Sequence, residues 1–232
     1  MSLDGMTIVV TGAYGNLGRA VAAKLETEGA KMVLAGRKRE ALDEAFPGET
    51  PKRIKVAVDL MDEAATVEAL AAAARQFGPI NGLCAIAGGF DMGTPVHETP
   101  AEAWARMFDL NVRTLLSSVK AVVPGMIEHG HGRIVTIGAL GAVRGGAKTA
   151  PYAVAKSSVM RITEAMAAEL AASGITVNCV MPSIVDTPEN RKAMPKADPS
   201  KWVSPDDIAA TIAFLMSPSA NAVNGALIPV TG

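Results

Sequence analysis

Cysteine is scarce in this chain of 232 residues, and its two cysteines, Cys84 and Cys179, both lie inside apolar runs. A thiol in such a run behaves as a small buried hydrophobe, so a disulfide-stapled secreted domain is not expected. No apolar stretch reaches the roughly 18 residues of a membrane-spanning helix, and the sequence enters an apolar strand directly after MSLDG. We therefore expect neither export nor membrane insertion, and the reducing cytoplasm is the expected location.

An excess of charge of one sign is also missing, because 22 Lys and Arg residues nearly cancel 23 Asp and Glu residues. This balance excludes the electrostatic footprint of a protein that binds nucleic acid or an anionic membrane, so the expected partner is a small molecule. The three histidines, His97, His129 and His131, are scattered along the chain, and helix ends are their expected positions. No metal site is predicted.

The apolar residues, 49% of the chain, suffice for one substantial core, and short β-rich runs alternate with segments of helical period. This alternation predicts a doubly wound α/β fold, a parallel seven-stranded sheet in a single domain over residues 1–232. The strands are expected near 6–11, 31–35, 53–58, 81–87, 132–138, 174–181 and 226–230. The helices are expected at Leu17–Gly29, Ala64–Phe77, Pro100–His129, Pro151–Ser173 and Pro205–Met216.

The segment from Pro182 to Trp202 breaks the alternation with four prolines and charges of both signs. We predict that it forms a substrate lid over the site. Within it, Met194 is a candidate to face the substrate. Arg191 and Lys192 are candidates to clamp an anionic substrate, the alternative being that both are solvated surface charges.

A glycine-rich motif, TGAYGNLG over residues 11–18, stands between the first predicted strand and the first predicted helix. Glycine permits the tight turn and lets backbone amides approach a pyrophosphate at the helix N-terminus, where the helix dipole favours negative charge. This placement predicts a Rossmann dinucleotide site. Its predicted cofactor-binding residues are Gly12, Tyr14, Gly15, Asn16, Leu17 and Gly18.

The second predicted strand lacks the acidic residue that would bind an adenosine ribose 2′-hydroxyl, and Gly36 and Arg37 stand there instead. An arginine can pair with a 2′-phosphate, so NADP(H) is favoured and NAD(H) is the alternative. The other interpretation of Arg37 is a solvated charge in a basic turn. Asp59, at the end of the third predicted strand, is a candidate partner for the adenine amino group or a cap of the next helix.

Tyr152 and Lys156 are four residues apart at the start of a predicted helix, so their side chains share one face. A nearby ammonium group favours the phenolate and lowers the pKa of a tyrosine, which lets the tyrosine act as an acid or base near neutral pH. We predict that this pair is catalytic, and an exposed helical pair is the ordinary alternative.

Together these motifs resemble the short-chain dehydrogenase/reductase family over essentially the whole chain. The matching features are TGAYGNLG, VDL at 58–60, AGG at 87–89, Asn111 in LNV, YAVAK, GITVN and PSIVDT at 182–187. The resemblance implies that Tyr152 is the proton donor or acceptor, that Lys156 binds the nicotinamide ribose and tunes the tyrosine, and that Asn111 holds a water against the lysine. A helix-kink role for Asn111 remains open.

The resemblance also extends the cofactor site and implies a homodimer or homotetramer built through the helices near 100–129 and 151–173. Ile184 and Thr187 are expected to support the nicotinamide carboxamide. The further residues expected at the cofactor are Leu60, Ala87, Gly88, Gly89 and Pro182.

Three features depart from the family pattern: the glycine spacing, Ala85-Ile86 in place of Asn-Asn, and Ala139 in place of the catalytic serine. Ala139 stands thirteen residues before Tyr152 and has no hydroxyl to donate to a substrate carbonyl. Together with CAIAGGF and the lid sequence through Trp202, the missing serine makes this chain similar to the quinonoid dihydropteridine reductases and to related bacterial-type reductases that lack the serine. The pterin reductases carry the acidic NADH-selecting residue that Gly36-Arg37 replaces.

The predicted function is therefore an NAD(P)H-dependent oxidoreductase that transfers a hydride between nicotinamide and a small organic substrate, with a pterin-like or quinonoid acceptor favoured. One alternative is a carbonyl or alcohol reductase of the 3-oxoacyl type, in which Thr149 or a backbone amide replaces the missing serine hydroxyl. The second alternative is a nucleotide-binding scaffold without turnover.

Overall fold

Seven strands form one parallel sheet in the computed structural model, which describes residues 2–48 and 50–232. The strand order is β3-β2-β1-β4-β5-β6-β7, and all neighbouring pairs in it are parallel. The strands are β1 Thr7–Thr11, β2 Lys31–Gly36, β3 Arg53–Ala57, β4 Ile80–Ala85, β5 Gly132–Ile137, β6 Ile175–Pro182 and β7 Leu227–Val230. The predicted seven-stranded doubly wound fold is confirmed, and its strand order reverses between β1 and β4.

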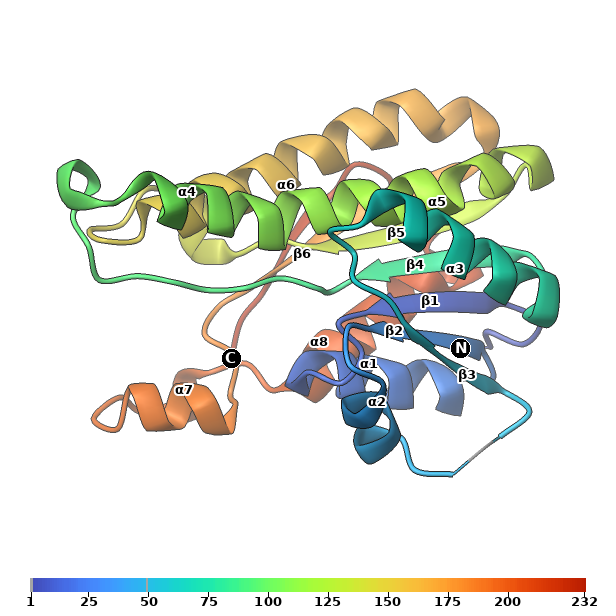
Figure 1. Ribbon diagram of the computed structural model, residues 1–232, viewed down its shortest axis with the longest axis horizontal. Helices are drawn as coiled ribbons and strands as arrows, with labels where there is room; N and C mark the ends of the chain where they lie inside the picture. Colours follow the sequence, from blue (N-terminus) through green and yellow to red (C-terminus); the bar gives the residue numbers. More distant parts are fainter. Residues whose placement is uncertain (1, 49) are drawn as a thin grey trace.

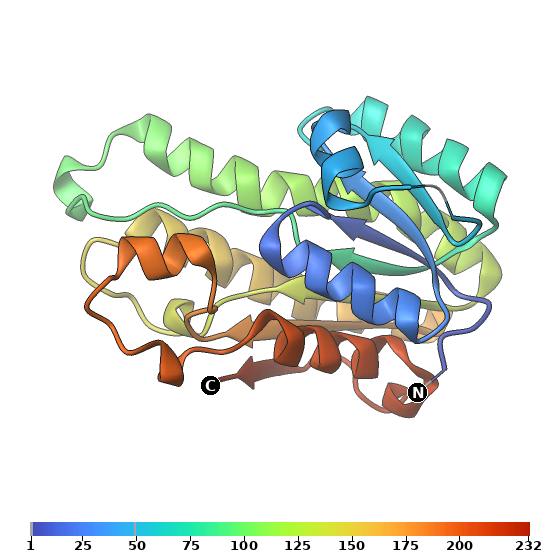
Figure 2. The ribbon, with the colours of Figure 1, turned by 90° about the horizontal axis from the view of Figure 1, so that it is seen from below.

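Helices cover both faces of the sheet, with α3, α5 and α6 on one face and α1, α2 and α8 on the other (Figure 1). The helices are α1 Asn16–Thr27, α2 Arg39–Ala45, α3 Glu63–Phe77, α4 Ala101–Phe108, α5 Thr114–His129, α6 Ala150–Leu170, α7 Pro188–Ala193 and α8 Pro205–Met216. In the view from below, α1 and α8 run side by side across the sheet (Figure 2). Within the described ranges, no helix is long and apolar enough to cross a membrane.

The hydrophobic core has two main layers, one on each face of the sheet. All five residues of β1 are buried, and side chains along a strand alternate between the two faces. Val10 packs in the layer under α1 and α8 with Leu25 and Ile212, whereas Val9 packs in the layer under α3, α5 and α6 with Leu70. Burial on both faces explains why the central strand β1 is almost continuously apolar in sequence.

Two helices and one helical irregularity were not expected from the sequence. The helices α2 and α7 have seven and six residues, too short to show a clear helical period. The predicted helix over 100–129 contains a π-helical turn at Asp109–Arg113 between α4 and α5. At this turn the side-chain amide of Asn111 donates a 2.9 Å hydrogen bond to the carbonyl oxygen of Met107, four residues earlier. The side chain of Asn111 thus competes with backbone amides for a carbonyl oxygen of the helix, which agrees with the helix-kink interpretation.

Candidate active site

A cleft of about 390 Å³ opens at the carboxyl ends of β1 and β4, where the strand order reverses. In open α/β sheets, ligands bind at this reversal point. The lining residues are Gly12, Tyr14, Gly15, Asn16, Leu17, Gly18, Gly36, Arg37, Val58, Asp59, Leu60, Met61, Ile86, Ala87, Gly88, Leu110 and Thr114. The structure therefore brings the glycine motif, Arg37, Asp59, Leu60, Ala87 and Gly88 together, and it adds Leu110 and Thr114 from the helix that follows.

The glycine loop is shaped by close backbone contacts that leave no room for side chains. Gly12 has a φ of +63°, in the left-handed region, and a Cβ there would lie 3.0 Å from the backbone of Ala87. A Cβ at Gly18 would lie 2.7 Å from the carbonyl oxygen of Ala13. Gly15 precedes α1, and no side chain caps this helix, so the first-turn amides face the cleft without a competing acceptor. The loop fits a pyrophosphate.

The far end of the cleft is bordered by Tyr14, Gly36 and Arg37. A Cβ at Gly36 would lie 2.6 Å from Cε1 of Tyr14, so glycine at this position lets the tyrosine ring lie against β2. Arg37 is exposed and pairs with no carboxylate in the described part of the chain. A free guanidinium at this rim fits a phosphate group on the adenosine ribose.

Asp59 lies at the same end of the cleft, and the interpretation that it caps the next helix is wrong. Asp62 caps α3, because its side chain accepts a 2.9 Å hydrogen bond from the amide of Ala65. The Asp59 carboxylate instead accepts a 3.0 Å hydrogen bond from the amide of Met61 inside its own loop. Its position in the cleft lining agrees with a role at the adenine.

Lys156 lies in the second turn of α6 and is 6% exposed. Its Nζ donates a 2.9 Å hydrogen bond to the carbonyl oxygen of Ile137 at the end of β5. A Cβ at Gly88 would lie 3.4 Å from this nitrogen, so the lysine lies against a residue of the cleft lining. Burial lowers the pKa of Lys156 to about 8.

Tyr152 begins the same helical face and packs edge-to-face against Phe90, with ring centroids 4.8 Å apart. Burial raises the pKa of Tyr152 to about 12. This direction is opposite to the expected lowering by Lys156, because desolvation disfavours the phenolate and no attraction to the lysine offsets it in this structure. Tyr152 is therefore protonated near neutral pH.

Asn111 is buried and is held against the AGG segment. Its Oδ1 accepts a 3.2 Å hydrogen bond from the amide of Gly89, and its Nδ2 donates a 3.0 Å hydrogen bond to the carbonyl oxygen of the same residue. A Cβ at Gly88 would lie 2.7 Å from Oδ1. Gly88 lines the cleft and thus lies between Asn111 and Lys156, two predicted catalytic side chains that do not themselves line it.

The surroundings of Tyr152 are apolar at the position where the family resemblance implies a serine. Ala139 is buried and packs in a small cluster with Ala142, Ala153 and the tyrosine. Thr149, the expected substitute donor, gives its hydroxyl hydrogen to the carbonyl oxygen of Gly146 at 3.0 Å.

Sequence reasoning missed Ser183, the first residue after β6. Its Oγ is buried and has no hydrogen-bond partner in the described part of the chain. Ser183 lies in the bend that directly follows β6, and the β6 residues Cys179 and Met181 belong to the cluster against which Tyr152 packs. The only sequence signal was its place in PSIVDT, directly after a strand.

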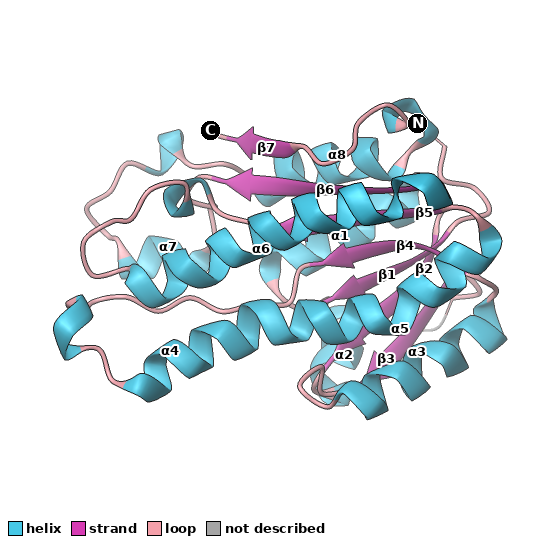
Figure 3. Ribbon diagram, turned by 90° about the horizontal axis from the view of Figure 1, so that it is seen from above, coloured by secondary structure: helices cyan, strands magenta, loops and turns pink. Residues whose placement is uncertain are grey.

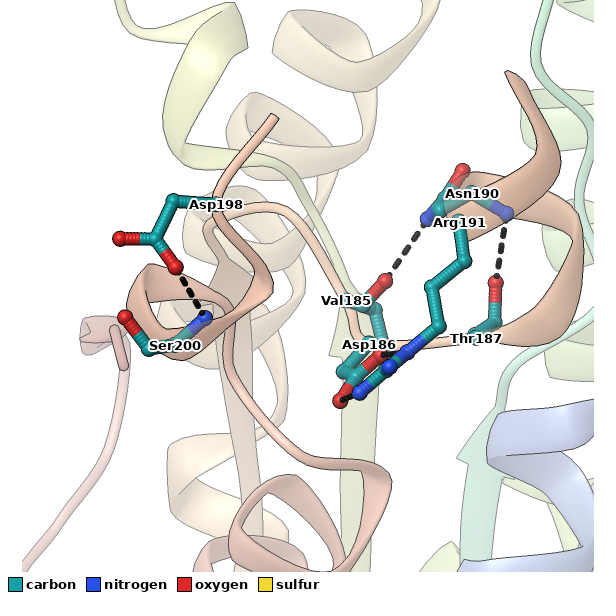
Figure 4. Close-up of polar contacts among 7 residues, drawn as sticks. All are labelled: Val185, Asp186, Thr187, Asn190, Arg191, Asp198 and Ser200. Carbon is teal, nitrogen blue, oxygen red and sulfur yellow. Dashed lines mark hydrogen bonds and ion pairs between the residues drawn. The ribbon is translucent and has the colours of Figure 1, made fainter. Parts of the chain in front are cut away.

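The lid residues make their polar contacts mainly with one another (Figure 4). The Thr187 hydroxyl accepts a 3.2 Å hydrogen bond from the amide of Asn190, and the Asn190 side chain donates a 2.8 Å hydrogen bond to the carbonyl oxygen of Val185. Arg191 donates two hydrogen bonds to Asp186, at 2.6 and 2.8 Å. This pair lowers the pKa of Asp186 and raises that of Arg191. Because Asp186 already neutralises Arg191, the geometry does not favour the anion clamp.

The other predicted lid and carboxamide residues do not line the cleft. Ile184 is 44% exposed, Met194 is half-buried, and Pro182 is buried at the end of β6. The helix α7 stands beyond the carboxyl ends of the strands, apart from the sheet (Figure 1). It meets the glycine loop through a hydrogen bond from Asn16 to Glu189.

Comparison with known proteins gives consistent matches over the whole chain. The enoyl-(acyl carrier protein) reductase family profile matches residues 12–232. Cis-4-hydroxycyclohexanecarboxylate dehydrogenase of Sinomonas cyclohexanicum is 32% identical over 235 residues, which cover 97% of this chain and 94% of that protein. A 3-oxoacyl-(acyl-carrier-protein) reductase of Vibrio cholerae is 30% identical over 242 residues, which cover 100% of this chain and 98% of that protein.

Solved structures superpose equally well. NAD⁺-bound xylitol dehydrogenase has a TM-score of 0.92 at 27% identity, covering 100% of both chains. A gluconate 5-dehydrogenase from Burkholderia cenocepacia J2315, in complex with NADP and tartrate, has a TM-score of 0.88 at 25% identity, covering 99% of this chain and 94% of that chain. These neighbours bind different nicotinamide cofactors on the same architecture.

Proposed function

Because this chain belongs to the short-chain dehydrogenase/reductase family, we propose that it is a reductase that uses NADP(H) and protonates its acceptor with Tyr152. Its relatives and structural neighbours are NAD(P)-dependent dehydrogenases and reductases, and this chain is an oxidoreductase of that class. The observation that carries the proposal is the single cleft end at which Gly88 separates Asn111 from Lys156, with Tyr152 one turn before the lysine.

The described residues fit a dinucleotide along the whole cleft. The glycine loop and the uncapped start of α1 would hold the pyrophosphate, and Arg37 would hold a 2′-phosphate. Asp59 would bind the adenine amino group, and Lys156 would bind the nicotinamide ribose. Ile184 and Thr187 would approach the carboxamide when the lid closes. The bound nicotinamide would supply the hydride.

The proton comes from Tyr152 in this proposal. Its raised pKa keeps the phenol protonated, and the partly buried ring packs against the apolar cluster that contains Ala139. The ammonium group of Lys156, which donates a hydrogen bond to the carbonyl oxygen of Ile137, would stabilise the negative charge that develops on the Tyr152 oxygen as the proton leaves. Asn111, fixed on Gly89, positions the AGG segment beside the lysine.

The acceptor that best fits this apolar environment is already polarised, as a quinonoid or pterin-like ring system is. Such an acceptor needs no second hydroxyl donor, which agrees with Ala139 at the buried position beside Tyr152. The second candidate is a carbonyl or alcohol substrate of the 3-oxoacyl type. The buried and unpartnered hydroxyl of Ser183 favours this candidate, because it could take the place of the missing serine donor.

An assay of the purified protein separates these candidates. NADPH and NADH oxidation would be measured against quinonoid dihydropterin, quinones and a panel of small ketones. We expect NADPH to support turnover, with quinonoid acceptors faster than ketones. Turnover of ketones alone would support the second candidate, and no turnover with any acceptor would contradict the proposed function.

We also propose self-association through the outer faces of α4, α5 and α6. Phe108, Leu116 and Val154 are exposed there, and an apolar depression lies between α4 and α6, lined by Trp104, Phe108 and Val154 among others. Exposed apolar surface of this kind marks interaction sites. Light scattering after size-exclusion chromatography would show a dimer or tetramer, and a monomer would contradict this assignment.

A further inference from the structure

A second polar cavity opens at the amino ends of β5 and β6, at the end of the sheet opposite the cofactor cleft. It has a volume of about 390 Å³. The strand arrowheads point away from this edge, so the cavity lies at the other end of the sheet from the cofactor cleft (Figure 3). Its lining residues are Gly130, His131, Arg133, Ala171, Gly174, Ile175, Thr176, Asn221 and Asn224.

Arg133, the second residue of β5, is the charged centre of this cavity. Its side chain is buried, with 3% of the residue exposed. Nη2 donates a hydrogen bond to the side-chain oxygen of Asn221, whereas Nε and Nη1 have no partner within residues 2–48 and 50–232. No carboxylate of those residues forms an ion pair with Arg133, and burial lowers its pKa. An arginine nonetheless stays protonated in proteins, so a buried positive charge is left uncompensated.

Thr176 supplies a second unsatisfied group on the same side of the sheet. It is the register partner of Arg133 on β6, and both residues line the cavity. Its Oγ1 is buried without a hydrogen-bond partner in the described part of the chain. Two neighbouring strands therefore bring unpaired buried donors to the lining of one cavity, and such unsatisfied groups are rare in folded proteins.

The remaining polar groups at the cavity carry no negative charge. Asn224 is already engaged, since its side chain accepts from the amide of Val177 and donates to the carbonyl oxygen of Ala167. His131 has a lowered pKa because of burial and the nearby Arg133 charge, so it is neutral near pH 7. The cavity thus combines one fixed cation with neutral donors.

We propose that this cavity binds a small phosphate-type oxyanion, with Arg133 as its cation and the Thr176 hydroxyl and Asn221 side-chain amide as further donors. An oxyanion would neutralise the guanidinium and accept hydrogen bonds from Nε or Nη1. Donors that reach the cavity from two strands and a loop suit the several acceptor oxygens of a tetrahedral phosphate group. The site is separate from the cofactor cleft, and the inference does not depend on the proposed reaction.

Titration of inorganic phosphate into the NADPH-saturated protein tests the site, because bound cofactor blocks the phosphate-binding groups of the other cleft. The melting temperature and the phosphorus-31 line width would be followed at constant ionic strength, balanced with sodium chloride. We expect a saturable rise in melting temperature and a saturable broadening. Glycerol phosphate would be titrated in parallel: an equal response identifies the phosphate group of a metabolite as the ligand, and a response to inorganic phosphate alone identifies the free ion.

Matched variants assign the response to this cavity. Arg133→Met should abolish it while leaving the fold intact, because the variant removes a buried charge that has no carboxylate partner and two donors that have no acceptor. Thr176→Val should weaken phosphate binding severalfold and covers the case in which Arg133→Met fails to fold. Arg75→Met removes an exposed arginine of α3 and should change nothing. The proposal is overturned by a wild-type response no larger than that to sodium chloride, by an equal response in Arg133→Met or in a folded Thr176→Val, or by an equal saturable response to acetate.

Discussion

The side-chain amide of Asn16 donates a 2.6 Å hydrogen bond to Oε2 of Glu189, and this contact joins the glycine loop to α7 across 173 residues of sequence. It brings a carboxylate to the loop that would hold the cofactor pyrophosphate. The pKa of Glu189 is lowered, chiefly by the hydrogen bond to its own backbone amide, so the carboxylate is charged near neutral pH. A bound cofactor would lie beside this contact, so we expect the lid to be coupled to cofactor binding.

The lid should therefore respond to cofactor. In the cofactor-free protein, we expect backbone amides of residues 184–201 to exchange hydrogen faster than those of β1 and β4, because α7 contributes no buried residues. NADPH should slow their exchange. Glu189→Ala should speed exchange in α7 of the free protein, whereas Glu189→Gln, which can still accept from Asn16, should not. Equal protection of the lid and the central strands in the free protein would contradict a moving lid.

Arg37 should determine the choice between NADPH and NADH. Arg37→Ala should weaken NADPH binding about ten- to a hundredfold, the equivalent of about 1.5–3 kcal/mol for one charge-assisted contact. NADH binding should be nearly unchanged, because NADH has no 2′-phosphate. Calorimetric titration measures both affinities, and Lys38→Ala, at the exposed neighbouring position, is the matched control. Unaltered selectivity in Arg37→Ala would show that the arginine is a solvated surface charge.

Tyr152→Phe should remove most activity and leave cofactor affinity intact. The substitution deletes the proton donor but keeps the ring that packs on Phe90. A loss of about 10²- to 10⁴-fold in kcat is expected for a general acid. Steady-state rates and cofactor titrations test both halves of this prediction. Wild-type rates on every accepted substrate would mean that another group donates the proton.

Substitutions at Ala139 and Ser183 should affect ketone reduction and the reduction of quinonoid acceptors differently. Ala139→Ser adds a hydroxyl beside Tyr152 and should accelerate ketone reduction by up to the equivalent of about 3 kcal/mol, while quinonoid acceptors gain little. Ser183→Ala should slow ketone reduction if its unpartnered hydroxyl already serves as the donor. Thr149→Val is the comparison, because that hydroxyl is bonded to Gly146. Ketone rates unchanged in all three variants would leave a backbone amide as the donor.

The buried Lys156 should make stability depend on pH in the alkaline range. Its pKa falls from an ordinary 10.5 to about 8 in the folded protein, so between these values the unfolded chain binds the extra proton. Stability therefore rises with pH through this range, because the charged form is disfavoured only in the fold. Denaturant unfolding at pH 7.5 and 10 should show that this rise is lost in Lys156→Met and kept in Lys52→Met, at an exposed position. A rise of equal size in Lys156→Met would assign it to other groups.

The sheet and the glycine loop follow from local patterns in the chain. A strand that is buried on both faces requires a continuous apolar run such as TIVV. A backbone that must approach a pyrophosphate requires glycine at positions 12 and 18. Such features depend on neighbours in sequence, so they can be recognised there. The helices α2 and α7 were not predicted because six or seven residues are too few to show a helical period. The π-helical turn was not predicted because it interrupts a continuous helical pattern, at a position where Asn111 bonds to the carbonyl oxygen of Met107.

Electrostatics and pairing across the molecule depend on which segments meet, and they could not be read from the chain. The spacing of Tyr152 and Lys156 predicted a lowered pKa for the tyrosine, but burial raises the pKa of Tyr152 and lowers that of Lys156. Desolvation depends on surroundings that the local sequence does not contain. Arg191 looked free to bind a substrate until the fold of the lid placed Asp186 against it. Arg133 and Thr176 lie far apart in sequence, and only the register of β5 on β6 brings their unsatisfied groups into one cavity.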